Sequence, residues 1–190
     1  MSPAIDLDTQ LMIRVQGDDA TSFGELLQRN RSIVLNYLSR MVVNRAIAEE
    51  LAQDVFVRVY RSRRTYEPSA KFSTWLYRIT TNVALNHFRD EKRSRNQLSL
   101  DVQDALQVRR EAQDVAPLVE DRLVNEVVTR QIRSAIRALP PKQRAAVIMH
   151  KYDEMDYAQI ARVLGCTTSA VKALMFRAYE TLRMRLKALT

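Results

Sequence analysis

The sequence predicts an all-α protein built as two small helical domains joined by a flexible linker. Its 190 residues provide room for one ordinary domain or two small ones. The chain holds only three glycines and five prolines, whereas a sheet-rich fold needs turn residues about every ten positions. Hydrophobic residues make up 46% of the chain, and in both halves they recur at helical spacing. We therefore expect helices to build the core.

The charge of the chain is distributed unevenly and predicts where the domains divide. The net charge is +8. Residues 1–95 carry 15 basic and 11 acidic side chains, residues 96–125 carry 3 and 6, and residues 126–190 carry 12 and 5. We expect a first lobe at 1–95, an acidic linker at 96–125 and a second lobe at 126–190. Basic lobes favour an anionic partner, although a merely biased soluble surface is the alternative.

Several classes of protein are excluded by composition. Cys166 is the single cysteine, so an intramolecular disulfide and a thiolate zinc site are not expected. No apolar run approaches the roughly 20 residues of a membrane span. The first residues lack the basic and apolar regions of a signal peptide. The chain is thus expected in the cytoplasm, without membrane insertion and without a cofactor.

Four helices are expected in the first lobe. A short one covers about Thr9–Gln16, and Ser22 with Glu25 forms a capping-box pattern that opens the second. Asn44 caps a third helix that ends near Arg61, and Ser73 caps a fourth that ends near Asp90. The positions assigned to the core include Phe23, Leu26, Leu27, Ile33, Val34, Tyr37, Leu38, Ile47, Leu51, Val55, Val59, Trp75, Leu76, Ile79 and Val83.

The helical pattern weakens between residues 91 and 124, where only a helical patch near 105–112 is expected. In the second lobe a helix runs from about Asn125 to Leu139, where Pro140 and Pro141 stop it and Pro141 can begin the next. Asp156 and Gln159 form a capping box before a short helix at 157–164. Gly165 is expected in the left-handed conformation, and Thr167 or Thr168 caps a last helix that reaches about Leu186.

These last two helices and their glycine turn predict a helix-turn-helix. The final helix has an apolar stripe at Val171, Leu174, Met175, Ala178 and Leu182. Its opposite face suits the major groove, since arginine and lysine bind guanine or phosphate and an aromatic ring contacts thymine methyl groups. A plain solvated surface is the alternative, but an outward aromatic ring and the preceding turn favour DNA. The predicted DNA-binding residues are Ser169, Lys172, Ala173, Phe176 and Arg177.

Two polar faces stand out in the first lobe. Glu50, Gln53, Asp54 and Val57 share one face of the third helix, opposite its apolar stripe. This acidic face suits a cationic protein surface; a solvated face or a metal site are alternatives, the latter weakened because the helix lacks histidine. On the fourth helix, amide and guanidinium groups that can bind bases and phosphates form a stripe three or four residues apart. That stripe consists of Arg78, Asn82, Asn86 and Arg89.

Three segments carry a resemblance to a known family. Residues 139–144 (LPPKQR), 156–166 (DYAQIARVLGC) and 170–172 (AVK) resemble region four of extracytoplasmic-function (ECF) sigma factors. Residues 48–59 (AEELAQDVFVRV) and 72–82 (FSTWLYRITTN) resemble region two of the same family, with Arg89 following. The match covers both lobes in the family order and leaves the linker unmatched.

The resemblance implies a specificity subunit of core RNA polymerase rather than an enzyme. It implies that the first lobe docks on the polymerase clamp and reads the minus-ten promoter element, with Asn82 at a family asparagine position. The second lobe would read the minus-thirty-five element, and an anti-sigma factor would hold the protein inactive. The segment Ala170–Leu174 lacks two polar side chains that are common in the family recognition helix, so base reading would depend on Lys172, Phe176 and Arg177.

Two rival functions remain open from the residues alone. An ordinary helix-turn-helix regulator would bind a palindromic duplex tightly without polymerase. A helical nuclease would need carboxylates or histidines clustered near a basic groove, and the sequence offers no such cluster.

Overall fold

A computed structural model describes residues 6–101 and 120–187. Within these ranges the chain forms eight α-helices and one short 3-10 helix, with no strand, which confirms the all-α prediction. The central part of the expected linker, including the helical patch at 105–112, lies outside the described residues. The elements are α1 (Leu7–Gln16), α2 (Ala20–Met41), α3 (Arg45–Arg61), η1 (Arg63–Thr65), α4 (Phe72–Asp101), α5 (Glu120–Arg137), α6 (Pro141–Lys151), α7 (Tyr157–Leu164) and α8 (Thr168–Lys187).

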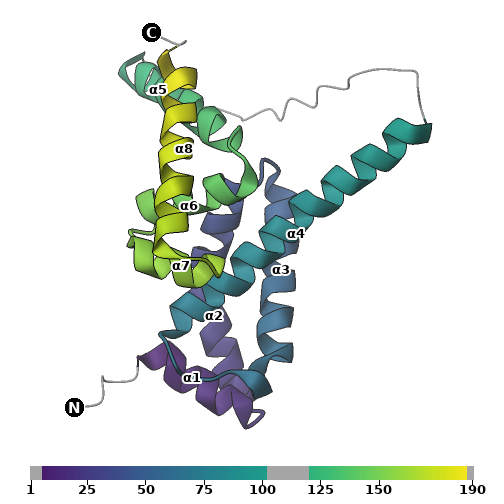
Figure 1. The fold of residues 1–190 in the computed structure, drawn as a ribbon. Helices are drawn as coiled ribbons and strands as arrows, with labels where there is room; N and C mark the ends of the chain where they lie inside the picture. Colours follow the sequence, from purple (N-terminus) through teal and green to yellow (C-terminus); the bar gives the residue numbers. More distant parts are fainter. Residues whose placement is uncertain (1–5, 102–119, 188–190) are drawn as a thin grey trace.

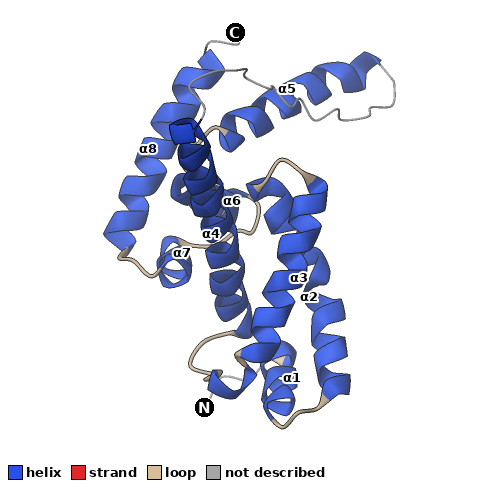
Figure 2. Ribbon diagram, turned by 90° about the vertical axis from the view of Figure 1, so that its right-hand side faces the viewer, coloured by secondary structure: helices blue, strands red, loops and turns tan. Residues whose placement is uncertain are grey.

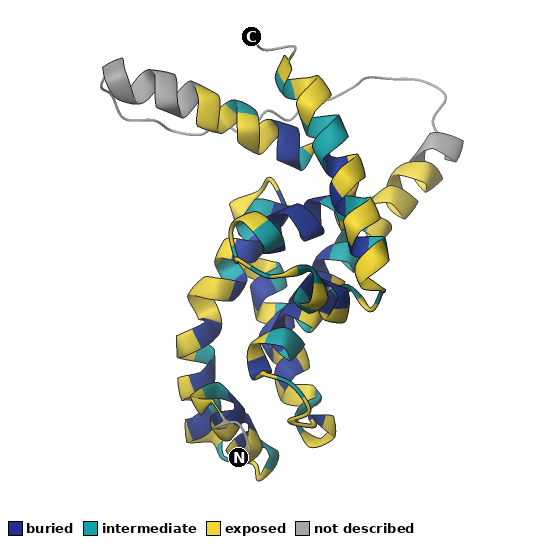
Figure 3. Ribbon diagram, turned by 60° about the vertical axis from the view of Figure 1, so that its left-hand side comes forward, coloured by how far each residue is buried: buried dark blue, intermediate teal, exposed yellow. Residues whose placement is uncertain are grey.

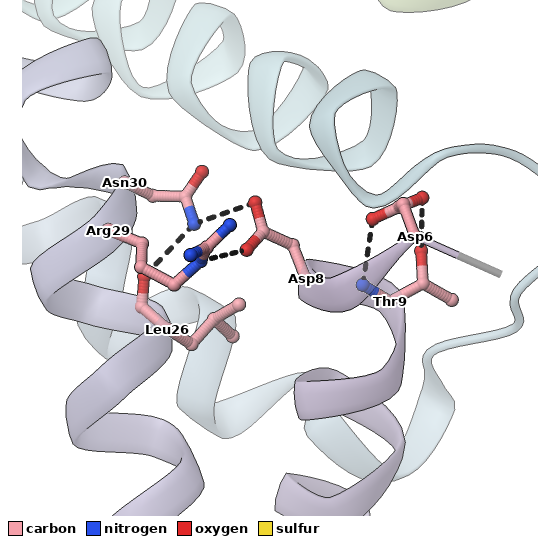
Figure 4. A network of polar contacts seen from close by, with 6 residues as sticks. All are labelled: Asp6, Asp8, Thr9, Leu26, Arg29 and Asn30. Atoms are coloured by element: carbon pink, nitrogen blue, oxygen red, sulfur yellow. Dashed lines mark hydrogen bonds and ion pairs between the residues drawn. The ribbon is translucent and has the colours of Figure 1, made fainter.

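Helix α1 lies against α2 and is held there by polar contacts (Figure 4). The side chain of Asp6 caps α1 by accepting a hydrogen bond from the Thr9 backbone N–H at 3.0 Å. Asp8 accepts hydrogen bonds from Arg29 at 2.7 Å and from Asn30 at 3.3 Å, both on α2. The first lobe therefore begins with the short helix α1, which packs against the long helix α2.

The start of α2 corrects one prediction from the sequence. Ser22 does not cap the helix, which begins at Ala20 and is capped by Asp19. The Asp19 carboxylate accepts bonds from the Ser22 backbone N–H at 3.1 Å and from its hydroxyl at 2.7 Å. A carboxylate can serve both donors and also favours the positive end of the helix dipole, so it replaces the hydroxyl as the cap. Ile33 is exposed rather than in the core.

Helix α4 also differs from its predicted limits. It begins at Phe72, whose ring is buried, so Ser73 lies inside the helix rather than capping it. It continues eleven residues beyond Asp90 and its end projects away from the other helices (Figure 1). Residues 91–101 contain neither glycine nor proline, and Glu91 pairs with Arg95 one turn later at 3.5 Å. Helix propensity and such pairs extend the helix without a hydrophobic face.

The second lobe follows its predicted plan closely. Pro141 is the first residue of α6, and the Asp156–Gln159 capping box of α7 is complete, with bonds of 2.7 and 2.8 Å. Gly165 ends α7 with φ 61° and ψ 42°. The Thr167 hydroxyl caps α8 by accepting the Ala170 N–H at 3.1 Å. Helix α5 begins earlier than expected, at Glu120, and ends at Arg137.

The two lobes pack directly against one another. Helix α7 lies on α4, while α5 and α6 lie against α2 (Figures 1 and 2). One cluster of buried apolar residues runs through both lobes (Figure 3). The sequence did not predict this arrangement, which brings the C-terminal end of α2 next to the start of α6.

Two glycines give opposite predictions for stability. Gly165→Ala should lower the free energy of unfolding by about 1 kcal/mol, because a left-handed residue gains a Cβ. Gly24→Ala should raise it by about 0.5–1 kcal/mol, because Gly24 lies inside α2 and its added Cβ meets nothing within 4 Å. Urea unfolding of the two variants measures both changes, and shifts of the same sign would contradict the assigned backbone conformations.

Candidate DNA- and polymerase-binding surfaces

Helix α8 separates a buried stripe from an exposed polar face, as its sequence predicts. Val171, Met175 and Ala178 are buried, and Leu174 and Leu182 are half-buried. The Phe176 side chain is 68% exposed. All five residues assigned to upstream DNA are exposed on this face: Ser169, Lys172, Ala173, Phe176 and Arg177. The Phe176 ring thus lies in solvent beside the exposed cations Lys172 and Arg177.

The first lobe leaves this face of the helix-turn-helix uncovered. Helix α7 lies between α8 and α4, so the first helix of the motif contacts the first lobe (Figure 2). The Asp156 cap and the left-handed Gly165 set the angle between α7 and α8. The recognition face consequently remains open to a duplex while the lobes are packed together.

The polar stripe of α4 lies mostly in solvent. Arg78, Asn82 and Arg89 are exposed, and Asn86 is half-buried. The other sides of the helix are occupied: Leu76 and Val83 belong to the core of the first lobe, and Thr81 forms a buried hydrogen bond with the Tyr37 hydroxyl at 2.9 Å. The structure thus leaves the amide and guanidinium groups of the stripe free of the core.

The acidic face of α3 is also at the surface. Glu50 and Gln53 are exposed, Val57 is 44% exposed, and Asp54 is half-buried. Asp54 accepts a hydrogen bond from Arg58 one turn later at 2.9 Å. Val57 lies one turn after Gln53 and Asp54, so this face combines an apolar contact point with the carboxylates of Glu50 and Asp54.

A groove of about 460 Å³ runs between α2 and α3 beside this face. Gln53 and Val57 line one of its edges, and the rings of Phe23 and Tyr60, 5.0 Å apart, form part of its wall. Sequence reasoning placed Phe23 in the core and overlooked Tyr60, which lies outside the apolar stripe of α3. The sequence did contain a signal for Tyr60, because an aromatic residue follows the exposed Val57 by one helical turn. The remaining lining residues are Leu27, Arg31, Leu35, Glu49, Ala52, Phe56 and Arg61.

A second hollow, of about 470 Å³, lies between α3 and α4 and brings two of the predicted sets together. Asp54 from the acidic face and Asn86 from the α4 stripe both line it, with His87 and Glu91 nearby. Most of the residues that line the hollow are charged or polar. Across residues 6–101 and 120–187 no three histidine, cysteine or acidic side chains are grouped so as to hold a metal ion.

Comparison with known proteins decides the family. Residues 26–94 match the family model of sigma-70 region 2, and residues 129–182 match that of sigma-70 region 4. The chain is 30% identical over 178 residues to the ECF RNA polymerase sigma factor SigW of Bacillus subtilis. The matched region covers 93% of this chain and 95% of SigW. The chain belongs to the ECF group of RNA polymerase sigma factors. This sigma factor is also 32% identical to the RNA polymerase sigma factor CarQ of Myxococcus xanthus, over 90% of this chain and 93% of CarQ.

Solved structures share the fold of this sigma factor. CnrH, in its complex with the cytosolic domain of CnrY, matches with a TM-score of 0.69 and 20% identity, covering 97% of this chain and all of CnrH. RpoE of Bartonella quintana, in complex with the anti-sigma factor NepR, matches with a TM-score of 0.63 and 21% identity, covering 88% of this chain and 98% of RpoE.

Membership of the family determines the general activity. Sigma factors are transcription initiation factors that direct RNA polymerase to promoters and carry out no catalysis of their own. In the described part of the chain, no helix combines the length and the apolar character that crossing a membrane requires.

Neighbouring residues of α8 give a prediction that tests its two faces. Met175→Ala should lower the free energy of unfolding by about 2–4 kcal/mol, because Met175 is buried in the core. Phe176→Ala should change it by less than about 0.5 kcal/mol, because its ring lies in solvent. Urea unfolding compares the two. A large loss of stability in Phe176→Ala would mean that this ring packs inside the protein and cannot read DNA.

Proposed function

We propose that this sigma factor binds core RNA polymerase through α3, reads the minus-ten element through α4 and reads the minus-thirty-five element through α8. The observation that carries the proposal is the recognition face of α8, where five predicted DNA-binding side chains are exposed together above a buried stripe. The proposed division is residues 1–95 for polymerase and the minus-ten element, and 126–190 for the upstream element, with the linker at 96–125.

The polymerase-binding residues of the proposal are Glu50, Gln53, Asp54 and Val57. A partner suited to them carries cationic side chains around an apolar residue that can contact Val57 and enter the adjoining groove. Carboxylates steer such a partner and specify its orientation, whereas burial of Val57 and the aromatic wall supplies most of the affinity. The four residues carry two carboxylates and no cation, so they do not suit DNA.

The two DNA-reading surfaces differ in the chemistry of their side chains. On α4, Asn82 and Asn86 can hydrogen-bond the edges of unpaired bases, and Arg78 and Arg89 can bind phosphates or stack on bases. On α8, Lys172 and Arg177 can reach guanine edges in the major groove, and Phe176 can contact thymine methyl groups. Amides suit single-stranded bases near the start site, and a rigid cationic helix suits an intact duplex upstream.

Regulation and location complete the proposal. RpoE is seen in complex with an anti-sigma factor, and we place this chain under the control of an inhibitor of the same kind. It acts in the cytoplasm, where polymerase and promoters are found, and it is not an enzyme. The linker carries more acidic than basic residues, and it passes through the polymerase channel, where it mimics nucleic acid.

The first test of this function is conversion of core polymerase into a promoter-specific form. Purified factor should bind core polymerase and initiate transcription from a subset of a promoter library. Val57→Lys should weaken core binding about tenfold or more. The lysine removes the apolar contact and repels the cationic side chains of the proposed partner. Ile13→Lys, at an exposed aliphatic residue of α1, is the matched control. Failure of the wild-type factor to bind core polymerase would reject the function, and tight duplex binding without polymerase would favour an ordinary regulator.

A second test concerns the upstream element. Arg177→Ala should weaken binding of the holoenzyme to a cognate promoter fragment by about 1–3 kcal/mol, if its guanidinium contacts guanine. Arg45→Ala is the matched control, since the Arg45 side chain is 84% exposed and lies on the first lobe. Electrophoretic mobility shifts with wild-type and mutated upstream elements measure the effect. Equal affinity of Arg177→Ala and wild type would show that Arg177 is only a surface cation.

A further inference from the structure

One arginine of the second lobe donates hydrogen bonds to backbone carbonyls at the C-terminal ends of helices in both lobes. The Arg144 side chain donates a hydrogen bond to the carbonyl of Met41, the last residue of α2. It also donates to the carbonyls of Arg137 and Leu139 at the end of α5. Arg144 is only 8% exposed. Because the last carbonyls of a helix lack partners and carry partial negative charge, a single guanidinium stabilises both ends at once.

Two aromatic contacts join the lobes beside Arg144. The Arg144 guanidinium carbon lies 4.9 Å from the centre of the Phe88 ring on α4. The guanidinium carbon of Arg40 on α2 lies 4.6 Å from the ring of Tyr152, at the end of α6. Stacking of this kind is directional and holds the lobes in one relative orientation.

A third contact lies between α4 and the turn after α6. The Tyr77 hydroxyl of α4 interacts with the carboxylate of Asp153 in the second lobe. Tyr77 is eleven residues, or three helical turns, from Phe88, so both side chains lie on the same face of α4. That face is therefore covered by the second lobe, whereas Arg78, Asn82 and Arg89 remain exposed.

These contacts are specific but incompletely paired. Burial raises the pKa of Asp153, although Tyr77 and Arg40 oppose that shift, and burial lowers the pKa of Arg144. Among the described residues, neither Asp153 Oδ2 nor Arg144 Nε has a hydrogen-bond partner, and both atoms are buried. Buried polar atoms without partners are costly. The contacts between the lobes can thus define one closed arrangement. The lobes can still separate when a partner with a larger binding surface binds them.

The closed arrangement cannot span the two promoter elements of the proposed function. Elements about 25 base pairs apart lie about 85 Å apart on a duplex, at roughly 34–36 Å per helical turn. In the closed form α7 lies directly on α4, with α8 beside α7 (Figure 1). A helix of 20 residues, the length of α8, extends only about 30 Å. The lobes must separate for both elements to be bound.

We propose that Arg144, Asp153 and Tyr152, with their partners on α2 and α4, form an autoinhibitory latch. The latch holds the free factor closed, so that the opening of the lobes limits its conversion into an active polymerase complex. This inference rests on the proposed function. It adds a restraint within the chain itself, present before any inhibitor binds.

Distance measurements on the full chain test the latch. Spin labels on Arg61→Cys in α3 and Arg162→Cys in α7, in a Cys166→Ser background, report the separation of the lobes, since both labelled positions are exposed. The wild-type factor should show one short, narrow distance. Asp153→Lys should broaden and lengthen it, because a lysine beside Arg40 repels and cannot accept from Tyr77. Glu154→Lys is the matched control, with the same change of charge at the next, exposed residue, and should match wild type.

Transcription with core polymerase supplies the second readout, on unlabelled variants. If opening limits activity, the concentration of Asp153→Lys needed for half-maximal transcription should fall about fivefold to tenfold, since the open fraction sets the apparent affinity. Circular dichroism checks that helix content is unchanged. Tyr77→Phe, which removes only the hydroxyl facing Asp153, should shift both readouts in the same direction by a smaller factor, and it decides the matter if Asp153→Lys does not fold.

Three outcomes would overturn the latch. The first is a wild-type factor whose lobes are already far apart. The second is a distance in Asp153→Lys and Tyr77→Phe equal to that of Glu154→Lys. The third is a longer distance without any fall in the half-maximal concentration, because opening would then not be limiting. If the wild-type factor supports no transcription at any concentration, the proposed function fails instead, whatever distances are measured.

Discussion

The arrangement of this sigma factor depends on how the C-terminal ends of α2 and α5 are satisfied. Both ends turn toward Arg144, whose guanidinium donates to carbonyls of each. A buried carbonyl without a donor costs about as much as a lost hydrogen bond. The start of α6 is therefore held against α2, and α7 is brought onto α4. The apolar core then continues from one lobe into the other.

Helix α4 shows how one element can serve several partners. Leu76 and Val83 pack into the first lobe, Tyr77 and Phe88 contact the second, and the polar stripe that includes Asn82 stays in solvent. An α-helix can separate three such roles because residues four apart lie on one face. Aromatic side chains of α4 serve both lobes, since Phe72 and Trp75 contact Tyr66 in the first lobe, whereas its amide and guanidinium groups lie toward solvent. Helix α8 divides more simply, into a buried stripe and one exposed face.

The surfaces proposed for DNA and polymerase follow from sequence periodicity, since exposure of Lys172, Phe176 and Val57 was expected from spacing alone and is observed. The groove beside Val57 was not expected, because it depends on where α2 lies relative to α3. The first residue of a helix is likewise difficult to predict from sequence spacing. The pattern at Ser22 and Glu25 predicted a cap, but Asp19 lies three residues earlier, accepts two hydrogen bonds from Ser22 and begins the helix there. Two competing caps differ only slightly in energy, so pattern alone does not choose between them.

The sequence by itself determined the features that depend on residues within about four positions of each other. Pro141 begins α6, Asp156 and Gln159 cap α7, and Gly165 ends it, because proline, capping groups and glycine act on the adjacent backbone. The family followed from motifs of the same local kind. Only the tertiary structure decided how the lobes meet. Arg144 finds its acceptor on Met41, 103 positions earlier, and no periodicity records a pairing that arises only when separate helices have packed.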